Sequence, residues 1–465
     1  MKFDLIVIGS GPGGYVAAIR AAQLGLQVGI IERESLGGIC LNWGCIPTKA
    51  LLKSAQVFEY IKHAETYGIS VGKSKADLNV MVRRSREVAD SMSKGVQFLM
   101  KKNKITVFNG TAKLLRGKKV EVTDASGKKE THDANHIIVA TGARAKELPN
   151  LKIDGKMIID YRKAMVLDTI PGKMVVVGAG AIGVEFAYFY NAVGTEVTIV
   201  EFLEQGLVPR EDADISKELA RQFKKAGIKV MAGTSVEKVE SKGKGCSVTV
   251  KDRKSGKEEQ IECDLVLSAA GVTPNTEDIG LESLGIKTDK GQIVVDKFYQ
   301  TNVPGIYAIG DVIPGPALAH VASAEGIICV EKIAGKNPEP LDYQNLPSCT
   351  YCSPEVASVG LTEAEAKEKG YEIKVGKFPY SASGKAKAAG APEGFVKLIF
   401  DAKYGEWLGA HMIGYNVTEL IAEVVVARNL ETTGHEIIKS VHPHPTMSEA
   451  VMEAAAAAYG EVIHL

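Results

Sequence analysis

The sequence has no net charge, few cysteines and no long apolar run. Acidic and basic side chains number 56 each, so no excess charge is available to attract nucleic acid or an anionic membrane. No stretch approaches the roughly 20 apolar residues that cross a bilayer, and residues 1–4 lead into a strand pattern rather than a signal peptide. Seven cysteines argue against an extracellular disulfide framework. We therefore expect a cytoplasmic protein that acts on small molecules and has neither nucleic-acid nor membrane partners.

The 465 residues are enough for about two to four domains, and the first opens with a dinucleotide-binding pattern. A short apolar run ends at Gly9, Gly11 and Gly14 follow, and a helical pattern then leads to a second strand that closes with Glu32. The glycines let the backbone approach a pyrophosphate at a helix N-terminus, and the carboxylate can accept hydrogen bonds from ribose hydroxyls. We call this complete pattern the first fingerprint.

A second fingerprint repeats the first at one constant offset. Its matching positions are Gly178, Gly180, Gly183 and Glu201. Each fingerprint is followed later by an alternating β-meander, over 120–140 and 247–267, and the chain then reaches Gly142 or Gly271. Each meander marks either a return to the cofactor or an ordinary connection. Two dinucleotide sites suggest a permanently held flavin and a nicotinamide nucleotide that exchanges.

Two cysteines, Cys40 and Cys45, lie five residues apart at the start of a helical pattern. In a regular helix this spacing gives about 7.5 Å of rise, which exceeds the Cα separation of a relaxed disulfide. A bridge would need an unwound helix start, which Gly44 and Pro47 permit. Strained bridges tend to be catalytic. Two buried thiols or half of a zinc site are the alternatives.

The other cysteines have weaker signals. Cys349 and Cys352 would point to opposite faces of a strand, and no second pair supplies further zinc ligands, so we expect no metal site. Cys246, Cys263 and Cys329 are interpreted as core residues.

Two further features, Asp311 and His444, are open to two interpretations each, and the stretch 50–102 has one. Asp311 ends a strand and could hold a polyol hydroxyl or cap the helical pattern that begins near residue 317. His444 follows His442 in a proline-rich loop; a loop histidine is often inert, but a dithiol enzyme needs a base near neutral pH. The mostly helical stretch 50–102 carries no expected chemistry, and its arginines at 83, 84 and 86 are expected to form a solvated face.

The motifs occur together, in one order, in a known family. These motifs are Cys40-Leu41-Asn42-Trp43-Gly44-Cys45, the two fingerprints, Gly310-Asp311, and His444-Pro445-Thr446 with Glu449. Over nearly its full length the chain resembles the pyridine nucleotide-disulfide oxidoreductases, and within them the branch that oxidises dihydrolipoamide with NAD. A glutathione-type disulfide reductase and a non-catalytic dinucleotide-binding scaffold are the alternatives.

The resemblance implies an α/β fold with two Rossmann-like dinucleotide-binding domains, inserted β-meanders and a C-terminal α+β dimerisation domain. The implied boundaries are 1–145 for the FAD-binding domain, 146–271 for the NAD-binding domain, 272–342 for a return to the FAD-binding domain, and 343–465 for dimerisation. The chain would form a homodimer. Because the sequence starts directly with a fingerprint, the lipoyl group would come from a partner, either a lipoyl domain of a 2-oxo acid dehydrogenase complex or a lipoylated carrier protein.

The resemblance also implies roles for single residues. Cys40 would exchange with the dithiol substrate, Cys45 would pass electrons to the flavin, and Lys49 would lie near the flavin ring and pair with Glu185. The residues that would hold FAD are Gly9, Gly11, Gly14, Glu32, Lys49, Thr141, Gly142, Asp311 and Ala319. The residues that would hold NAD are Gly178, Gly180, Gly183, Glu201 and Gly271.

The base and two departures complete what the resemblance implies. His444 would be the base, oriented by Glu449, and it would act on the dithiol of the other subunit. Val272 stands where the family commonly has an arginine, and the expected proline is missing near Ala145. These departures affect only the details of cofactor contact.

Overall fold

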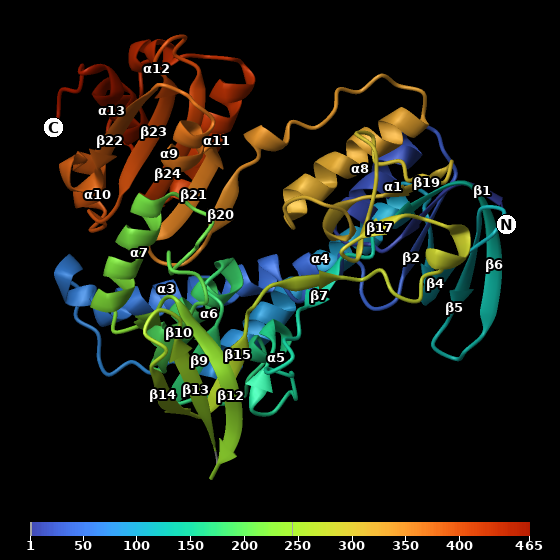
Figure 1. Cartoon of the computed structure of the whole chain (residues 1–465), viewed down its shortest axis with the longest axis horizontal. Coiled ribbons are helices and arrows are strands. Elements are labelled where there is room, and N and C mark those ends of the chain that lie inside the picture. Colours follow the sequence, from blue (N-terminus) through green and yellow to red (C-terminus); the bar gives the residue numbers. More distant parts are fainter. Residues whose placement is uncertain (1, 244) are drawn as a thin grey trace. The chain divides into compact units, whose positions relative to one another are not determined.

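A computed structural model describes residues 2–243 and 245–465, and the chain forms two compact units (Figure 1). The first unit comprises Met1–Leu51, Asn79–Lys146 and Gly271–Leu341; the second comprises Leu52–Leu78, Glu147–Ala270 and Asp342–Leu465. Among the described residues, no helix combines the length and the apolar character that a membrane span requires.

The first unit is built on a mainly parallel sheet. Its strands are β1 (Lys2–Ile8), β2 (Val28–Glu32), β3 (Thr106–Asn109), β4 (Thr111–Leu115), β5 (Lys119–Thr123), β6 (Lys129–Val139) and β19 (Ile306–Ala308). They follow the order β3-β2-β1-β6-β5-β4, and β19 also pairs with β6. Strands β4, β5 and β6 form the predicted meander, and β6 continues into the parallel part of the sheet.

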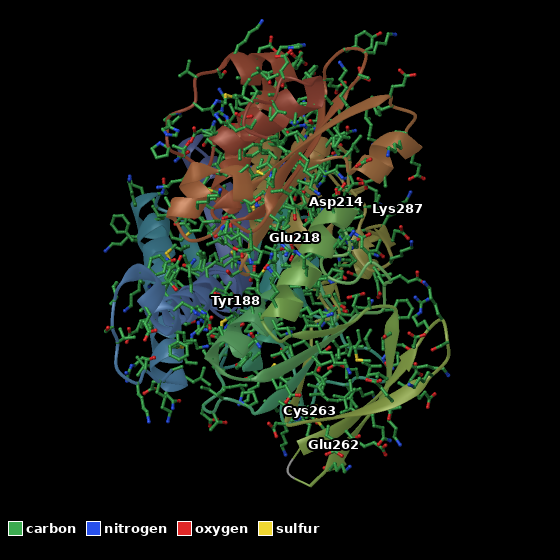
Figure 2. All side chains as sticks on the ribbon, turned by 90° about the vertical axis from the view of Figure 1, so that its left-hand side faces the viewer. Tyr188, Asp214, Glu218, Glu262, Cys263 and Lys287 are labelled. Carbon is green, nitrogen blue, oxygen red and sulfur yellow. The ribbon has the colours of Figure 1, made fainter. Side chains whose placement is uncertain are left out.

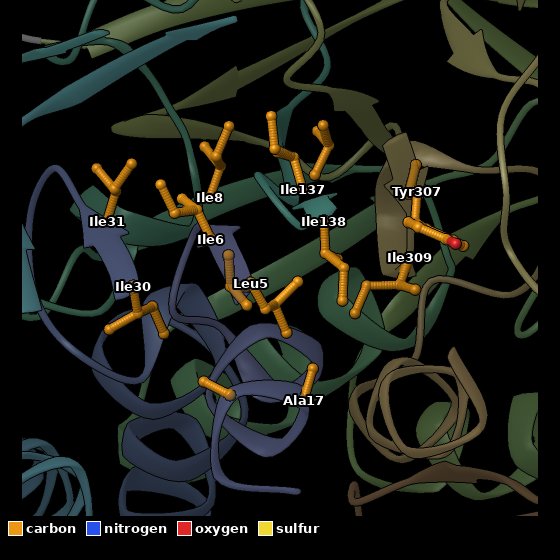
Figure 3. Close-up of a cluster of buried hydrophobic side chains, with 14 of the residues drawn as sticks. Leu5, Ile6, Ile8, Ala17, Ile30, Ile31, Ile137, Ile138, Tyr307 and Ile309 are labelled. Atoms are coloured by element: carbon orange, nitrogen blue, oxygen red, sulfur yellow. The ribbon is translucent and has the colours of Figure 1, made fainter. Parts of the chain in front are cut away.

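Apolar residues on both faces of this sheet explain its position in the core. Leu5, Ile6, Ile30, Ile137 and Ile138 are all buried, and Figure 3 shows them gathered from three strands. Runs of this kind are typical of parallel strands that are covered on both sides. Helices α1 (Pro12–Gln23) and α8 (Ala319–Ile333) pack against each other in the same unit (Figure 1).

The helices between β2 and β3 are divided between the two units, because residues 52–78 belong to the second unit. They are α2 (Gly38–Asn42), α3 (Cys45–Lys62) and α4 (Leu78–Lys102), with a 3-10 turn at Ala64–Tyr67. This confirms the helical prediction for residues 50–102. A short antiparallel ribbon, β7 (Ala143–Ala145) with β16 (Val272–Pro274), lies where the chain leaves and re-enters this unit.

The second unit contains a second parallel sheet, in the order β11-β10-β9-β15-β8. Its elements are β8 (Ile158–Ile159), α5 (Tyr161–Ala164), β9 (Lys173–Val177), α6 (Ala181–Val193), β10 (Glu196–Val200), α7 (Ala213–Lys225), β11 (Lys229–Met231) and β15 (Leu265–Ser268). The meander is a separate sheet of β12 (Thr234–Lys242), β13 (Gly245–Asp252) and β14 (Glu258–Cys263). The predicted meander over 247–267 therefore ends at Cys263, because the chain changes sheets at Asp264 and continues as β15 in the parallel sheet.

The C-terminal part of this unit is an antiparallel sheet flanked by helices, in the order β20-β21-β24-β23-β22. Its strands are β20 (Ser348–Thr350), β21 (Glu355–Gly360), β22 (Ile373–Pro379), β23 (Phe395–Asp401) and β24 (Trp407–Gly414). Its helices are α9 (Glu363–Glu368), α10 (Gly384–Ala388), α11 (Val417–Asn429), α12 (Gly434–Lys439) and α13 (Glu449–Tyr459).

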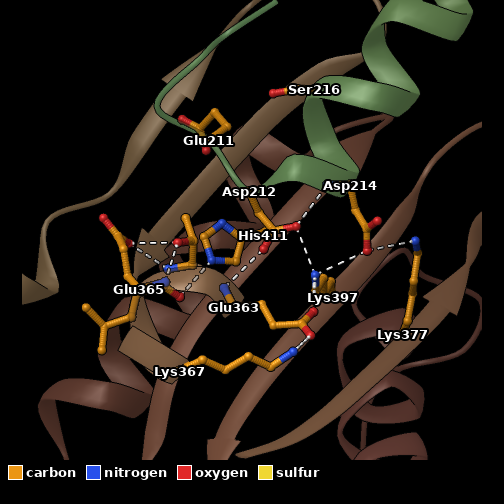
Figure 4. Close-up of polar contacts among 12 residues, drawn as sticks. Glu211, Asp212, Asp214, Ser216, Glu363, Glu365, Lys367, Lys377, Lys397 and His411 are labelled. Carbon is orange, nitrogen blue, oxygen red and sulfur yellow. Dashed lines mark hydrogen bonds and ion pairs between the residues drawn. The ribbon is translucent and has the colours of Figure 1, made fainter. Parts of the chain in front are cut away.

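A buried ion cluster joins α7 to the C-terminal sheet (Figure 4). Lys397 on β23 is 3% exposed and donates to Asp212 at 2.9 Å and to Asp214 at 3.1 Å. Glu363 lies 2.7 Å from the same ammonium group. Asp212 also caps α7 by accepting the Asp214 N–H. Because a buried charge is costly unless it is paired, these contacts fix the start of α7 on the sheet.

Candidate functional site

The first fingerprint forms a turn in which two glycines are required and the third faces open space. Gly9 has φ +98°, and a Cβ there would lie 2.2 Å from the Ala140 carbonyl oxygen. A Cβ on Gly14 would lie 1.9 Å from the Gly9 oxygen. A Cβ on Gly11 would meet nothing within 4 Å, and Gly11 is the N-cap of α1 without a side-chain cap. The backbone is therefore open to a phosphate at a helix N-terminus.

The second fingerprint repeats this geometry. A Cβ on Gly178 would lie 2.5 Å from Ala269 O, and one on Gly183 would lie 2.0 Å from Gly178 O. Gly180, the N-cap of α6, again has nothing within 4 Å. Both turns thus leave open the one position at which a pyrophosphate would approach.

Glu32 and Glu201 bind the backbone of their own fingerprints in the same way. Oε2 of Glu32 accepts the Ser10 N–H at 3.0 Å, and Oε2 of Glu201 accepts the Ala179 N–H at 2.7 Å. Each carboxylate oxygen has two lone pairs, so each acid can hold its loop and still accept a ribose hydroxyl. The residues of both fingerprints therefore fit a dinucleotide. The Ser10 hydroxyl, which donates to Glu32 at 2.6 Å, was missed although it lies inside the motif.

The other residues assigned to FAD lie in the first unit. Asp311 belongs to a 3-10 turn, Gly310–Val312, and α8 is capped by Leu318, so the alternative interpretation of Asp311 as its cap was wrong. Burial raises the pKa of the Asp311 carboxyl. Ala319 is the first residue of α8, whose N-terminus has no side-chain cap. These groups offer a carboxylate and a helix N-terminus to a ligand.

The ribbon β7–β16 contains both departures from the family pattern. Val272 pairs directly with Ala145. Beside this pair, the Thr141 hydroxyl donates to Asn275 O at 2.6 Å, and the Asn275 N–H donates to Gly142 O at 2.8 Å. The two unusual residues are thus cross-strand neighbours. Asn275 was not identified from the sequence, because its partner lies far along the chain.

Cys40 and Cys45 lie on either side of a break between two helices. Helix α2 ends at Asn42 and α3 begins at Cys45, so the helical start is interrupted as the spacing predicted. Both thiols are partly exposed. A hydrogen bond to Cys45 and burial together raise the pKa of Cys40 well above its ordinary value. The two sulfurs are therefore in contact, and the proton is held on Cys40.

Helix α4 contacts this dithiol segment, so the prediction of a solvated arginine face holds for the exposed Arg83 but is wrong for Arg86, which is only partly exposed. The Arg84 guanidinium donates to Ala50 O at 2.7 Å, and the Ser85 hydroxyl donates to Pro47 O at 3.0 Å. Arg86 donates to Asn42 O, and burial lowers the pKa of this side chain. No spacing rule indicates such contacts, because they join two helices through single carbonyl groups.

The second unit contains the histidine assigned as base. His444 Nδ1 lies 2.7 Å from Glu449 Oε1, and the other oxygen of Glu449 accepts the Thr446 N–H at 2.7 Å. Partial burial opposes ionisation of Glu449, but these hydrogen bonds outweigh it and lower its pKa. The His444 side chain is 78% exposed. In the same loop, His442 lies 2.8 Å from Glu423 of α11, a pair that the sequence did not indicate, and this hydrogen bond raises the pKa of His442.

Several predicted pairings join the two units and stay predictions. Lys49 lies in the first unit, whereas Glu185 lies in the second, where it accepts the Tyr351 N–H at 3.0 Å. The dithiol and His444 are likewise in different units.

The remaining cysteines are mostly buried. Cys246 and Cys263 face each other across β13 and β14 with 3.5 Å between their sulfurs, and Cys263 is labelled in Figure 2. Both belong to the meander core, as predicted, but as a contacting pair that the sequence did not indicate. The Cys352 thiol donates to Pro354 O at 3.1 Å. Within residues 2–243 and 245–465, no group of three metal-ligating side chains is present.

Residues 3–326 match the family described as pyridine nucleotide-disulphide oxidoreductase, and residues 346–455 match the dimerisation domain of that family. The chain therefore belongs to this family. This confirms the predicted α/β fold class and the resemblance.

Individual relatives cover the whole chain. It is 50% identical over 479 residues to the dihydrolipoyl dehydrogenase of Rhizobium etli, covering 100% of this chain and 99% of the relative. It is 49% identical to the dihydrolipoyl dehydrogenase of Zymomonas mobilis, covering 99% of both. Among solved structures, LpdA from Mycobacterium tuberculosis matches with a TM-score of 0.90 and 28% identity over 97% of this chain and 98% of that one. The flavoprotein disulfide reductase RclA from Escherichia coli matches with a TM-score of 0.86 and 27% identity, covering 97% and 99%.

Proposed function

We propose that the chain oxidises dihydrolipoyl groups and passes their electrons through FAD to NAD⁺. The structural observation that carries this proposal is the contact between the Cys40 and Cys45 thiols at a helix break, in a chain with two open dinucleotide turns. The choice of substrate rests on full-length identity of 50% and 49% to dihydrolipoyl dehydrogenases.

The proposed cofactor sites follow the two fingerprints. FAD would be held by Gly9, Gly11, Gly14, Glu32, Lys49, Thr141, Gly142, Asp311 and Ala319, within domain segments 1–145 and 272–342. NAD would be held by Gly178, Gly180, Gly183, Glu201 and Gly271, within domain segment 146–271. When bound, FAD accepts an electron pair from the dithiol and supplies it as hydride to NAD⁺.

The chain's own residues carry the sulfur chemistry. His444, oriented by Glu449, removes a proton from the substrate dithiol. The substrate thiolate attacks Cys40 of the oxidised pair, the Cys40–Cys45 bond breaks, and Cys45 leaves as a thiolate. The second substrate sulfur then attacks the first, which closes the substrate disulfide and releases Cys40. The substrate loses two electrons and two protons; the pair gains the electrons, Cys40 takes up one proton as its thiol, and His444 holds the other. Lys49 is assigned to stabilise the negative charge near Cys45.

Assembly and partners extend this proposal. The region 343–465 would form a homodimer, in agreement with the dimerisation domain matched by residues 346–455. The exposed apolar side chains of this region include Val426 at 58%, Leu430 at 68% and Val441 at 98%. The electron donor would be a lipoyl group on a separate protein. The low, odd cysteine count favours action in the cytoplasm.

The assay that tests the function compares two reactions of the purified holoenzyme. We expect rapid NAD⁺ reduction by dihydrolipoamide and little glutathione disulfide reduction by NADPH. The similarity to a flavoprotein disulfide reductase makes the second reaction the relevant alternative. The reverse result would assign the chain to that alternative.

NAD should also be strongly preferred over NADP, because the Glu201 carboxylate repels a 2′-phosphate. The Glu201→Ala variant should therefore show a smaller preference for NAD over NADP.

A further inference from the structure

The link between the two thiols is short and contains no regular structure. It consists of Trp43 and Gly44, which lie between the end of α2 and the start of α3. The position of Cys40 relative to Cys45 depends on this link, because each cysteine belongs to a different helix. Any group that holds the link also sets the distance between the sulfurs.

One side chain of α4 reaches this link. The Arg86 guanidinium donates to the carbonyl of Asn42, the last residue of α2, and it stacks 4.3 Å from the centre of the Trp43 ring. The indole N–H of Trp43 donates to Glu34 at 2.7 Å. The Trp43 ring is thus held by a cation on its face and by a carboxylate at its edge. A cation at this distance from an indole is attracted by the ring, and the planar guanidinium can stack and donate at once.

The Asn42 side chain adds a second connection at the same point. Its amide donates to Leu36 O at 3.0 Å and to Gly38 O at 2.9 Å. The carbonyl that Arg86 binds therefore belongs to a residue already tied to the start of α2. Holding this carbonyl consequently holds the whole short helix that carries Cys40.

We propose that Arg86 is a positioning residue for the Cys40–Cys45 pair. Together with Trp43, it fixes the link in the arrangement that brings the two sulfurs into contact. The inference deepens the proposed function, and it rests on that function only for the reaction that the pair performs. A fixed link raises the effective concentration of one thiol at the other, so it stabilises the disulfide relative to the dithiol. Removing the guanidinium should therefore favour the dithiol.

The test measures the equilibrium of the pair directly. Holoenzyme is equilibrated with mixtures of reduced and oxidised dithiothreitol, quenched with acid and alkylated, and the fraction of the Cys40–Cys45 peptide with two free thiols is measured by mass spectrometry. When the Cys40–Cys45 bond forms, the two cysteines lose two electrons and two protons. Oxidised dithiothreitol accepts them, and its cyclic disulfide is reduced to two thiols. We expect Arg86→Met to lower the disulfide-to-dithiol ratio about tenfold, which equals about 30 mV for a two-electron couple.

The neighbouring Arg83 provides the matched control, because it is an exposed arginine on the same helix. Arg83→Met should leave the ratio unchanged, and Arg86→Lys should restore part of it, because an ammonium can still stack on Trp43 and donate to Asn42. Trp43→Leu should shift the ratio in the same direction, and the Trp43→Leu/Arg86→Met double variant should shift it by less than the sum of the single shifts. A Trp43→Leu enzyme with an unchanged ratio would overturn the inference, even if Arg86→Met did not fold.

The measurement uses neither dihydrolipoamide nor NAD, so two failures can be distinguished. If the wild-type pair forms no disulfide at any dithiothreitol ratio, the proposed dithiol function is wrong, and the inference falls with it. If the wild-type pair titrates normally and Arg86→Met titrates like Arg83→Met, only the positioning role of Arg86 is wrong.

Discussion

At the scale of single residues, the raised pKa of Cys40 determines which sulfur carries the proton. The shift comes first from the hydrogen bond to Cys45 and then from burial. A raised pKa favours the protonated form, so in the reduced pair Cys40 stays a thiol through the neutral range and loses its proton only at alkaline pH.

Replacing Cys45 tests this distribution of the proton. Cys45→Ala removes the sulfur that accepts the hydrogen bond, so the pKa of Cys40 should fall toward its ordinary value. Alkylation of Cys40 by iodoacetamide at neutral pH should then be faster, by about tenfold for each unit by which the pKa of Cys40 falls. Cys45→Ser keeps an acceptor oxygen and should give an intermediate rate. Equal pH profiles for Cys40 in both variants would show that the hydrogen bond does not control the proton.

At the scale of elements, the duplicated glycine turns provide a matched pair of variants. Gly11 and Gly180 have negative φ angles and open space around their Cβ positions, so alanine should leave the fold intact at either site. Gly11→Ala should lose FAD, because the methyl group fills the space assigned to the pyrophosphate. Gly180→Ala should keep FAD and raise KM for NAD. Flavin absorbance after gel filtration and steady-state kinetics measure the two effects.

Gly14→Ala is the control for these variants. Its Cβ would lie 1.9 Å from Gly9 O, which backbone cannot accommodate without moving. We expect the Gly14→Ala protein to be insoluble or strongly destabilised. The Gly11→Ala protein should instead melt at the same temperature as wild-type protein without FAD. A Gly11→Ala protein that retains full FAD would assign the open space to something other than a cofactor.

The buried ion cluster of α7 leads to a prediction about stability and pH. Burial opposes ionisation of Asp212, but hydrogen bonds from Lys397 and from backbone N–H groups outweigh it and lower its pKa. Lys397→Met should destabilise the second unit by about 3–5 kcal/mol, because it leaves Asp212 buried without its cation. Lys377→Met should cost less than about 1 kcal/mol, because Lys377 is 44% exposed and contacts only the rim of the cluster at Asp214.

The sign of the pH effect follows from the lowered pKa. A carboxylate with a lowered folded-state pKa contributes stability above its unfolded pKa, and this contribution is lost as the pH falls through the folded pKa. The wild-type melting temperature should therefore fall in the acidic range below about pH 4. In Lys397→Met this acid-dependent part should be smaller, because the cation that lowers the pKa is gone. Calorimetry over a pH series measures both slopes, and parallel slopes would contradict the role of Lys397.

The same elements show which features the sequence could predict. Strands β1 and β9 could be predicted because each is a short apolar run followed directly by a glycine-rich turn. The two signals are adjacent in the sequence and support each other. Strand β22 has no clear alternating pattern, because Gly376, one of its inward positions, carries no apolar side chain; α13 packs so closely there that a Cβ would lie 1.8 Å from Ala454 O. The contacts of Lys397 and Arg86 were also missed, because each depends on groups brought together only by folding.

At the scale of the whole molecule, the proposed reaction needs residues from both units. Cys40 and Cys45 belong to the first unit, whereas His444 and Glu449 belong to the second. The family resemblance assigns His444 to the dithiol of the other subunit in a two-fold dimer. Symmetry then gives two identical sites, each built from both chains.

This arrangement predicts complementation between two inactive variants. Homodimers of Cys45→Ser and of His444→Ala should each be nearly inactive in dihydrolipoamide oxidation, because electron transfer and proton removal are both required. In the mixed dimer, one site carries both defects and the other carries neither. The mixed dimer, isolated by two different affinity tags, should recover about half of the wild-type activity. If His444 acted on its own chain, every site would keep one defect, so an inactive mixed dimer with its full content of FAD would refute the shared site.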